Sequence, residues 1–192
     1  MLPIVKAPNA ILLQIAKPVP IKSGPVGKID KDMRKLIAQM KETLSNTTNP
    51  EGIGLAAPQV GKSLKLFIIQ ETPKAPAEVF INPVITPVSE ESKTSKPSRK
   101  KQSKSSKLEG CLSLPNIWGI VNRTPTVTIS YLDEHGNKQT QTSKGFKATI
   151  LQHEYDHLQG VLFPKKVLEQ KNTLYKSKKN KKGEDEFEEL EV

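Results

Sequence analysis

The chain is 192 residues long, carries a formal net charge of +10 and contains a single cysteine, Cys111. This length predicts one domain with a sizeable buried core, and a single cysteine excludes an internal disulfide. The most apolar stretch near the start, AILLQIA, is interrupted by Gln14, so the sequence predicts neither a membrane span nor a secretory signal. We therefore expect a cytoplasmic protein.

Most of the positive charge lies in two stretches. Residues 89–107 hold seven Lys or Arg against two Glu and no apolar side chain, and residues 165–182 hold eight Lys against one Glu. Residues 184–191 then hold six acidic side chains. A segment without apolar side chains cannot offset the entropy of ordering, so we expect a disordered basic insertion at 89–107. We expect a catalytic domain over 1–168 and a frayed, charged C-terminal tail over 169–192.

In chain order, the apolar pattern first predicts a helix and two strands. Asp30 can cap a helix whose apolar side chains share one face, namely Met33, Leu36, Ile37, Met40 and Leu44. The stretches KLFIIQ (65–70) and EVFINPVI (78–85) predict strands because they are rich in β-branched and aromatic residues.

A hairpin and a second helix follow. Residues 126–133 and 139–144 predict its two strands, with His135 in the turn, and a helix is expected from about Gly145 to Gly160. There is no βαβ repeat. The fold class is therefore predicted to be α+β, with antiparallel or mixed sheets packed around the helix that carries HEYDH (153–157) in a single domain.

The second predicted helix contains LQHEYDHLQG, in which His153 and His157 are four residues apart. On a helix they share a face, and two neutral imidazoles at this spacing can hold one tetrahedral metal ion. Glu154, directly after the first histidine, can reach a water on that metal. The alternative is an ordinary helix with two partly exposed histidines.

A third ligand is available in KLEGCLSLP, where Cys111 follows a glycine. A catalytic zinc-type site takes three protein ligands and leaves one position for water, and one Cys with two His completes that number. A small buried core thiol is the alternative, and it is the more common role of a lone cysteine.

The stretch GIGLAAPQVG (52–61) has little side-chain bulk. It can present backbone N–H and C=O groups to an extended peptide, and Gln59 can donate its amide N–H to a developing oxyanion. The alternative is a glycine-rich turn before the strand at 65–70.

The stretches GIGLAAPQ, EGCLS and QHEYDH, in this order, resemble the three signature motifs of the peptide deformylase family. IVKAPNAILLQIAKPV near the start and GVLFPKKV after the motif helix also resemble that family. The resemblance covers roughly residues 3–88 and 108–168. It implies a metal-dependent hydrolase that removes the formyl group from the N-terminal formylmethionine of new proteins and releases formate.

The matching motifs assign roles at the metal to residues of this chain. The resemblance implies that Cys111, His153 and His157 bind one divalent ion, with Fe²⁺ expected first and Zn²⁺, Ni²⁺ or Co²⁺ as substitutes. It implies that Glu154 is the general base and acid, and that the Gln59 amide and the backbone N–H of Leu112 meet the oxyanion.

The residues expected to contact substrate are Gly52, Ile53, Gly54, Glu109, Trp118, Phe146 and Ile150. The two glycines would pair with the substrate backbone, and Ile53, Phe146 and Ile150 would line an apolar pocket for methionine, or else belong to the ordinary core. Glu109 and Arg123 resemble an ion pair that steadies the ligand segment; the alternative is a weak surface salt bridge. Trp118 is expected on the substrate approach or as a cap on the core.

Two rival functions use the same features. A peptide-cutting metalloprotease also carries H-E-x-x-H, and an inactive relative could be a binding module that docks on ribosomes through its lysines. We expect a monomer that binds formylmethionyl nascent peptides, with ribosome contact through residues 165–182. There Val167, Leu168, Leu174 and Tyr175 recur at helix-like intervals, and the acidic run 184–191 is expected to fold back and screen the lysines.

Overall fold

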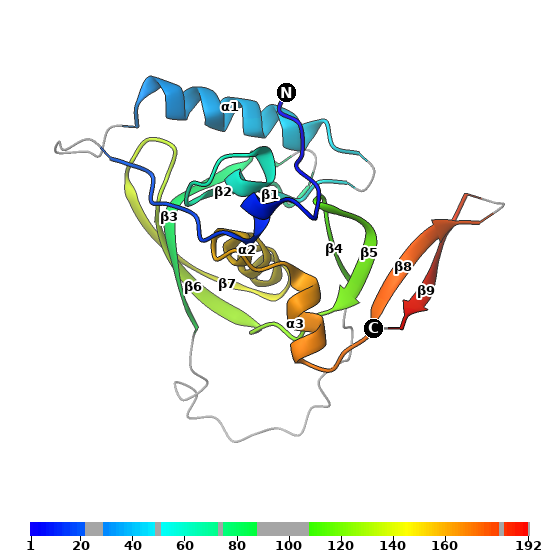
Figure 1. Ribbon diagram of the computed structural model, residues 1–192. Helices are drawn as coiled ribbons and strands as arrows, with labels where there is room; N and C mark the ends of the chain where they lie inside the picture. Colours follow the sequence, from blue (N-terminus) through cyan, green and yellow to red (C-terminus); the bar gives the residue numbers. More distant parts are fainter. Residues whose placement is uncertain (22–28, 49–50, 73–74, 88–107, 181–182, 192) are drawn as a thin grey trace, which may run out of the picture.

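Two antiparallel sheets surround a central helix in the computed structural model of the protein (Figure 1). The structure describes residues 1–21, 29–48, 51–72, 75–87, 108–180 and 183–191, so the expected insertion at 89–107 lies outside the described residues. In chain order the elements are η1 (Ala10–Leu13), α1 (Lys31–Ser45), β1 (Gly54–Ala56), η2 (Ala57–Val60), β2 (Leu66–Ile69), β3 (Glu78–Pro87), β4 (Leu108–Cys111), β5 (Leu114–Ile120), β6 (Thr126–Leu132), β7 (Lys138–Lys144), α2 (Gly145–Leu158), α3 (Phe163–Glu169), β8 (Leu174–Lys179) and β9 (Asp185–Leu190).

The five-stranded sheet, in the order β1-β2-β3-β6-β7, is covered on both faces. All four residues of β2 are buried, as expected for a continuous apolar strand between two layers. Leu66 and Ile68 pack with the apolar side of α1, whereas Phe67 and Ile69 pack with Ile150 and other residues of α2. This alternation makes α2 the centre of the molecule, with α1 on the opposite face of the sheet.

The predicted elements of this part are confirmed. The Asp30 side chain caps α1 by accepting a hydrogen bond from the Met33 N–H at 2.8 Å, and the predicted apolar face is buried. Strands β6 and β7 form the predicted hairpin, with Thr126 opposite Lys144, and α2 follows directly. The α+β prediction, with antiparallel sheets around the motif helix, is therefore correct.

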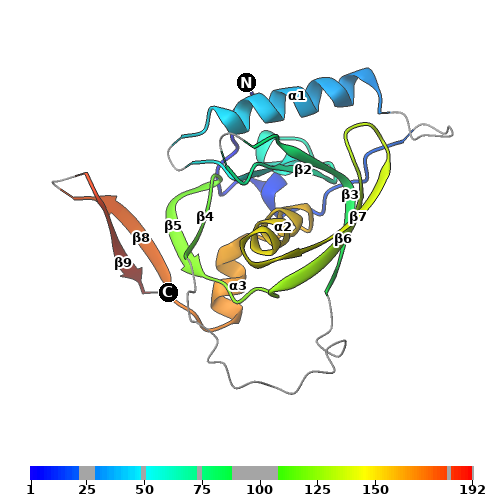
Figure 2. The same ribbon diagram turned by 180° about the vertical axis from the view of Figure 1, so that it is seen from behind.

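The four-stranded sheet, in the order β4-β5-β8-β9, corrects the prediction for the C-terminus. Instead of a frayed tail with a helical face, the chain leaves α3 and forms a hairpin that pairs with β5 and extends away from the body (Figure 2). Leu174 lies opposite Gly119 and is buried with Val167, so the apolar residues that suggested helical spacing are divided between a helix and a strand.

The charges of the C-terminal hairpin explain why so polar a sequence can pair. Strand β8 contributes three lysines and β9 four acidic residues, and the register brings them together. Lys179 lies 3.0 Å from Asp185, and Lys178 also contacts Glu188. Opposite charges across a strand pair are stabilising, so the acidic run folds back on the lysines as predicted, but as a strand. None of the described helices is long and apolar enough to cross a membrane.

Candidate metal centre

Three ligand side chains from two layers of the fold meet in the interior. His153 and His157 lie one turn apart on α2, and Cys111 ends β4. One ligand atom from each lies within 4.8 Å of the other two. The predicted Cys/His/His group therefore assembles in space, although Cys111 is more than 40 residues of chain away from the two histidines.

Cys111 reaches this point because β4 and β5 form a tight hairpin. Cys111 pairs with Leu114, which leaves Leu112 and Ser113 as a two-residue turn. The Cys111 Sγ lies 3.2 Å from His157 Nε2. Burial by itself raises the pKa of the Cys111 thiol, but the neighbouring His157 and His153 outweigh it and lower that pKa well below its usual range. The thiolate, which is the form that binds metals, is thereby favoured.

His153 is oriented by a buried chain of charges. Its Nδ1 lies 3.1 Å from Glu109 Oε2, which leaves Nε2 for a metal. Arg123 donates two hydrogen bonds to Glu109, at 2.9 and 2.8 Å, and a third to Asp156 at 2.5 Å. The side chains of Arg123 and Glu109 are only 7% and 9% exposed, so the ion pair is not a surface salt bridge. Burial opposes ionisation of Glu109, but Arg123 and His153 lower its pKa to about 2.

Glu154 is buried against the glycine-rich stretch. It is 3% exposed, and a Cβ added at Gly54 would lie 2.2 Å from Glu154 Oε1. The other oxygen, Oε2, is buried and has no hydrogen-bond partner among the described residues. Burial raises the pKa of Glu154 to about 7, with partial compensation from His153 and His157. A carboxylate in this state can take up or release a proton near neutral pH.

Gln59 is held with its amide nitrogen toward Cys111. It is 1% exposed, and its Oε1 accepts a hydrogen bond from the Ala56 N–H at 2.8 Å, which fixes the amide orientation. Its Nε2 lies 3.4 Å from Cys111 Sγ and 3.3 Å from Ser113 Oγ. An amide N–H donor therefore lies beside the candidate ligand Cys111.

Comparison with known proteins agrees with this arrangement. A family model described as polypeptide deformylase matches residues 1–173. A peptide deformylase from Pseudothermotoga lettingae is 40% identical over 142 residues, covering 74% of this chain and 72% of that protein. One from Christiangramia forsetii is 38% identical over 184 residues, covering 88% and 87%. The chain belongs to the peptide deformylase family.

The fold comparison is equally consistent. The crystal structure of the peptide deformylase from Thermotoga maritima matches with a TM-score of 0.68 at 31% identity, covering 86% of this chain and 97% of that one. Peptide deformylases remove the N-formyl group from nascent peptides, so this chain is a hydrolase of a metal-dependent family.

The donor set of this deformylase fits a divalent metal. One thiolate and two imidazoles suit iron, zinc, cobalt or nickel, and three protein ligands are the number found in catalytic sites. The contact between Glu109 and the Nδ1 of His153 is the usual support of a metal-binding histidine. Glu154 Oε2 is a buried polar atom with no partner among the residues that the structure describes, and a bound water could satisfy it.

The predicted substrate residues are less tightly grouped. Ile53 and Ile150 pack in one apolar cluster, but Phe146, on the first turn of α2, is 46% exposed. The Trp118 ring packs on Gly110, where an added Cβ would lie 2.7 Å from it, and donates to Ser177 of the C-terminal hairpin at 3.0 Å. The tryptophan thus connects β4 to that hairpin.

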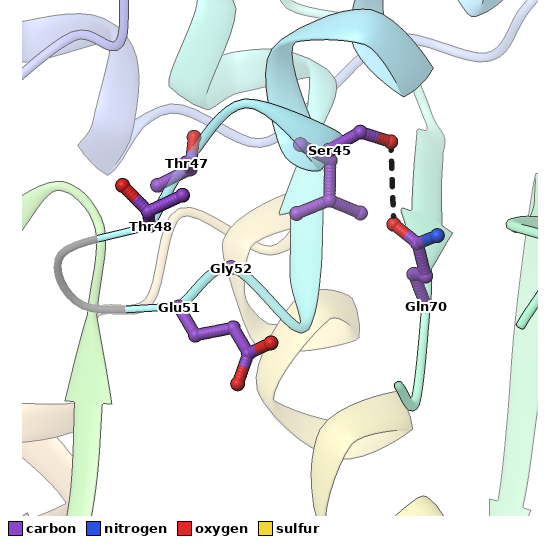
Figure 3. A pocket seen from close by; sticks show the side chains of 7 residues that line it. Ser45, Thr47, Thr48, Glu51, Gly52 and Gln70 are labelled. Carbon is purple, nitrogen blue, oxygen red and sulfur yellow. Dashed lines mark hydrogen bonds between the residues drawn. The ribbon is translucent and has the colours of Figure 1, made fainter. Parts of the chain in front are cut away.

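Gly52 lines a pocket at the end of α1. The pocket is lined by Leu44, Ser45, Thr47, Thr48, Glu51, Gly52 and Gln70 (Figure 3). Ser45 Oγ donates across it to Gln70 Oε1 at 3.4 Å. An added Cβ at Gly52 would lie 2.7 Å from Leu44 Cδ1, so close packing on α1 requires glycine here.

Two supporting residues were not predicted from the sequence. Asp156 shares Arg123 with Glu109, and Ser113 holds the Gln59 amide. Asp156 lies inside the H-E-Y-D-H stretch, so an acidic residue among the ligands was the available signal. The role of Ser113 depends on a contact across 54 residues of chain, for which the sequence offers no spacing rule.

Proposed function

We propose that Cys111, His153 and His157 hold the catalytic metal of this deformylase and that Glu154 is its general base and acid. The supporting observation is the convergence of three ligand atoms within 4.8 Å beside a buried carboxylate oxygen of Glu154 that has no hydrogen-bond partner in the described part of the chain. A plain core thiol or a pair of surface histidines would not bring these groups together.

The proposed reaction uses the protein groups in sequence. A divalent cation held by Cys111, His153 and His157 would supply a water of lowered pKa and would polarise the formyl oxygen. Glu154 accepts a proton from the attacking water and returns it to the departing amine. The Gln59 amide and the Leu112 N–H donate hydrogen bonds to the formyl oxygen as negative charge develops on it. The formyl carbon bears only hydrogen, so a narrow site admits it and excludes larger acyl groups.

We propose that the formylmethionyl peptide binds as a strand beside this centre. Strands β1 and β4 are both edge strands of their sheets, so each has backbone groups available for an added strand. Gly54 lies in β1 and Glu109 in β4. Ile53 and Ile150, in one apolar cluster, support a methionine pocket, with the exposed Phe146 at its outer side and Trp118 behind β4.

Ferrous iron is the metal that we propose, on the strength of the family resemblance and the mixed thiolate and imidazole donors. We further propose that the protein acts as a monomer in the cytoplasm and contacts ribosomal RNA through its C-terminal lysines. The paired hairpin supports the screening part of that proposal, because three of the four acidic residues of β9 lie opposite the three lysines of β8.

One experiment separates deformylase, protease and inactive binding module. Wild-type protein is expected to release formate from formyl-Met-Ala-Ser and to leave an unformylated peptide uncut. Glu154→Ala should keep its metal and lose formate release, because Glu154 acts on water and is not a ligand. Cys111→Ala should lose both metal and activity. Normal turnover by Glu154→Ala would overturn the proposed mechanism, and cleavage of the unformylated peptide would favour a protease.

A further inference from the structure

The N-terminal stretch Val5–Ala7 lies across both segments that carry the proposed oxyanion donors. The Val5 N–H donates to the Gln59 carbonyl at 2.8 Å, and the Ala7 N–H donates to the Ser113 carbonyl at 3.0 Å. Between them, Lys6 Nζ donates to the Leu112 carbonyl at 2.5 Å. In Figure 1 this dark blue stretch passes beside the end of β4. Three successive residues thus connect β4–β5 to η2.

Hydrogen bonds from the N-terminal stretch help to fix the conformation of the Leu112–Ser113 turn. A two-residue turn has few internal hydrogen bonds, and the direction of the Leu112 N–H depends on its dihedral angles. Both carbonyls of this turn are held by the N-terminal stretch, one by a backbone N–H and one by the ammonium of Lys6. Hydrogen bonds from a charged donor are generally stronger than those from a neutral N–H.

We propose that Lys6 is a positioning residue for deformylation. Its ammonium holds the Leu112 carbonyl so that the Leu112 N–H stays aimed at the oxygen on which negative charge develops. This inference rests on the oxyanion role proposed for Leu112 and Gln59. The hydrogen bond from the Leu112 N–H to the substrate oxygen is strongest in the transition state. Misalignment of that N–H therefore lowers kcat and leaves KM nearly unchanged.

Substitution of Lys6 is not expected to unfold the N-terminal stretch. The Lys6 side chain is exposed, and the hydrogen bonds from Val5 and Ala7 are made by backbone atoms. Substitution of Lys6 therefore leaves the N-terminal stretch docked by its main chain. A Lys6 variant is expected to fold, to keep its metal and to lose only the alignment of the turn.

The test compares Lys6→Met, Lys6→Arg and a matched control, Lys35→Met, which alters an exposed lysine of α1 far from the turn in sequence. Formate release from formyl-Met-Ala-Ser gives kcat and KM, and metal content and melting temperature are measured on the same samples. Lys6→Met is expected to lower kcat about tenfold, less than the loss of a direct oxyanion donor, with KM within about twofold. Lys6→Arg, which keeps a charged donor, should recover most of kcat, and Lys35→Met should match wild type.

Each other result decides against the proposal. Wild-type protein that releases no formate would overturn the deformylase mechanism itself, before Lys6 is considered. If wild type is active and Lys6→Met has the same kcat, Lys6 has no positioning role. A raised KM alone, or a loss of kcat that follows metal content and melting temperature, would make Lys6 a binding or structural residue. Failure of Lys6→Arg to exceed Lys6→Met would show that the charged donor is irrelevant.

Discussion

An alanine in place of Gly54 would overlap the carboxylate of Glu154. Its missing side chain leaves the space that Glu154 occupies, since an added Cβ would lie 2.2 Å from Oε1 and 2.6 Å from Cδ of that carboxylate. No backbone torsion demands glycine at this residue, as its φ is not positive. The glycine is therefore explained by the carboxylate and not by a turn.

Gly54→Ala is expected to lower kcat by about 100-fold, because a displacement of the base by about 1 Å can have that effect. Metal content should be unchanged. Gly119→Ala is a matched contrast, since its Cβ would lie 2.7 Å from Val167 Cγ2 in the core under α3. That variant should lose thermal stability and keep kcat per folded molecule. A normal kcat for Gly54→Ala would contradict the contact with Glu154.

At this scale the sequence predicted the Cys/His/His group and one support beside it, the ion pair of Glu109 with Arg123. The Cys/His/His group and Glu154 lie in short motifs whose spacing reflects metal chemistry. The other supports were not predicted, because they are contacts between distant segments, such as Lys6 with Leu112 and Ser113 with Gln59. Such contacts depend on how strands are registered, and no local pattern encodes that.

At the scale of elements, periodicity and capping correctly predicted helices α1 and α2 and the hairpin of β6 and β7. They did not predict the secondary structure of the C-terminus. The apolar spacing after Pro164 fitted a helix, but the chain reverses at Lys171, whose φ is +56°, and continues as a strand. Strand β8 is stabilised by pairing with β5, a partner about 55 residues earlier, so propensity within the segment could not reveal it.

The hairpin also changes how ribosome contact should be tested. Ending the chain at Pro164 would remove Val167 and Leu174 from a buried cluster, so charge substitutions are preferable. Neutralising β9 by Asp185→Asn, Glu186→Gln and Glu188→Gln should increase co-sedimentation with ribosomes at low salt, because the lysines of β8 lose the acidic side chains opposite them. Binding should fall steeply as salt rises.

The matched control neutralises β8 instead, by Lys176→Gln, Lys178→Gln and Lys179→Gln, and should decrease co-sedimentation. Turnover on a short formyl peptide should be the same in both sets. If the two sets bind ribosomes equally, the hairpin is not the anchor.

At the scale of the whole molecule, the metal centre joins the two sheets. Cys111 belongs to the four-stranded sheet, and His153 and His157 lie on the helix that packs against the five-stranded sheet. A metal held by all three is a cross-link between these layers, and a ligand that binds only the folded state stabilises it.

Iron-loaded protein is therefore expected to lose activity and melting temperature together in aerated buffer. Oxidation of the Cys111 thiolate would destroy one of the three ligands, and oxidation of the iron would inactivate the enzyme and favour loss of the metal; either would weaken the connection between the layers. Nickel-loaded protein should keep both properties over the same period, and anaerobic iron-loaded protein is the control. Equal lifetimes of the two forms in air would count against an oxygen-sensitive iron site.

The N-terminal stretch described above has a consequence for the order of synthesis. Its partners are Gln59, the turn at 112–113 and, further along, Leu158, whose carbonyl accepts from the Ala16 N–H at 2.9 Å. Translation runs from the N-terminal to the C-terminal side, so Val5–Ala7 must wait for residue 113 and Ala16 must wait for Leu158 before they can dock. A newly made copy of this enzyme therefore assembles its active site only after α2 has been made, when Ala16 docks on the last residue of that helix.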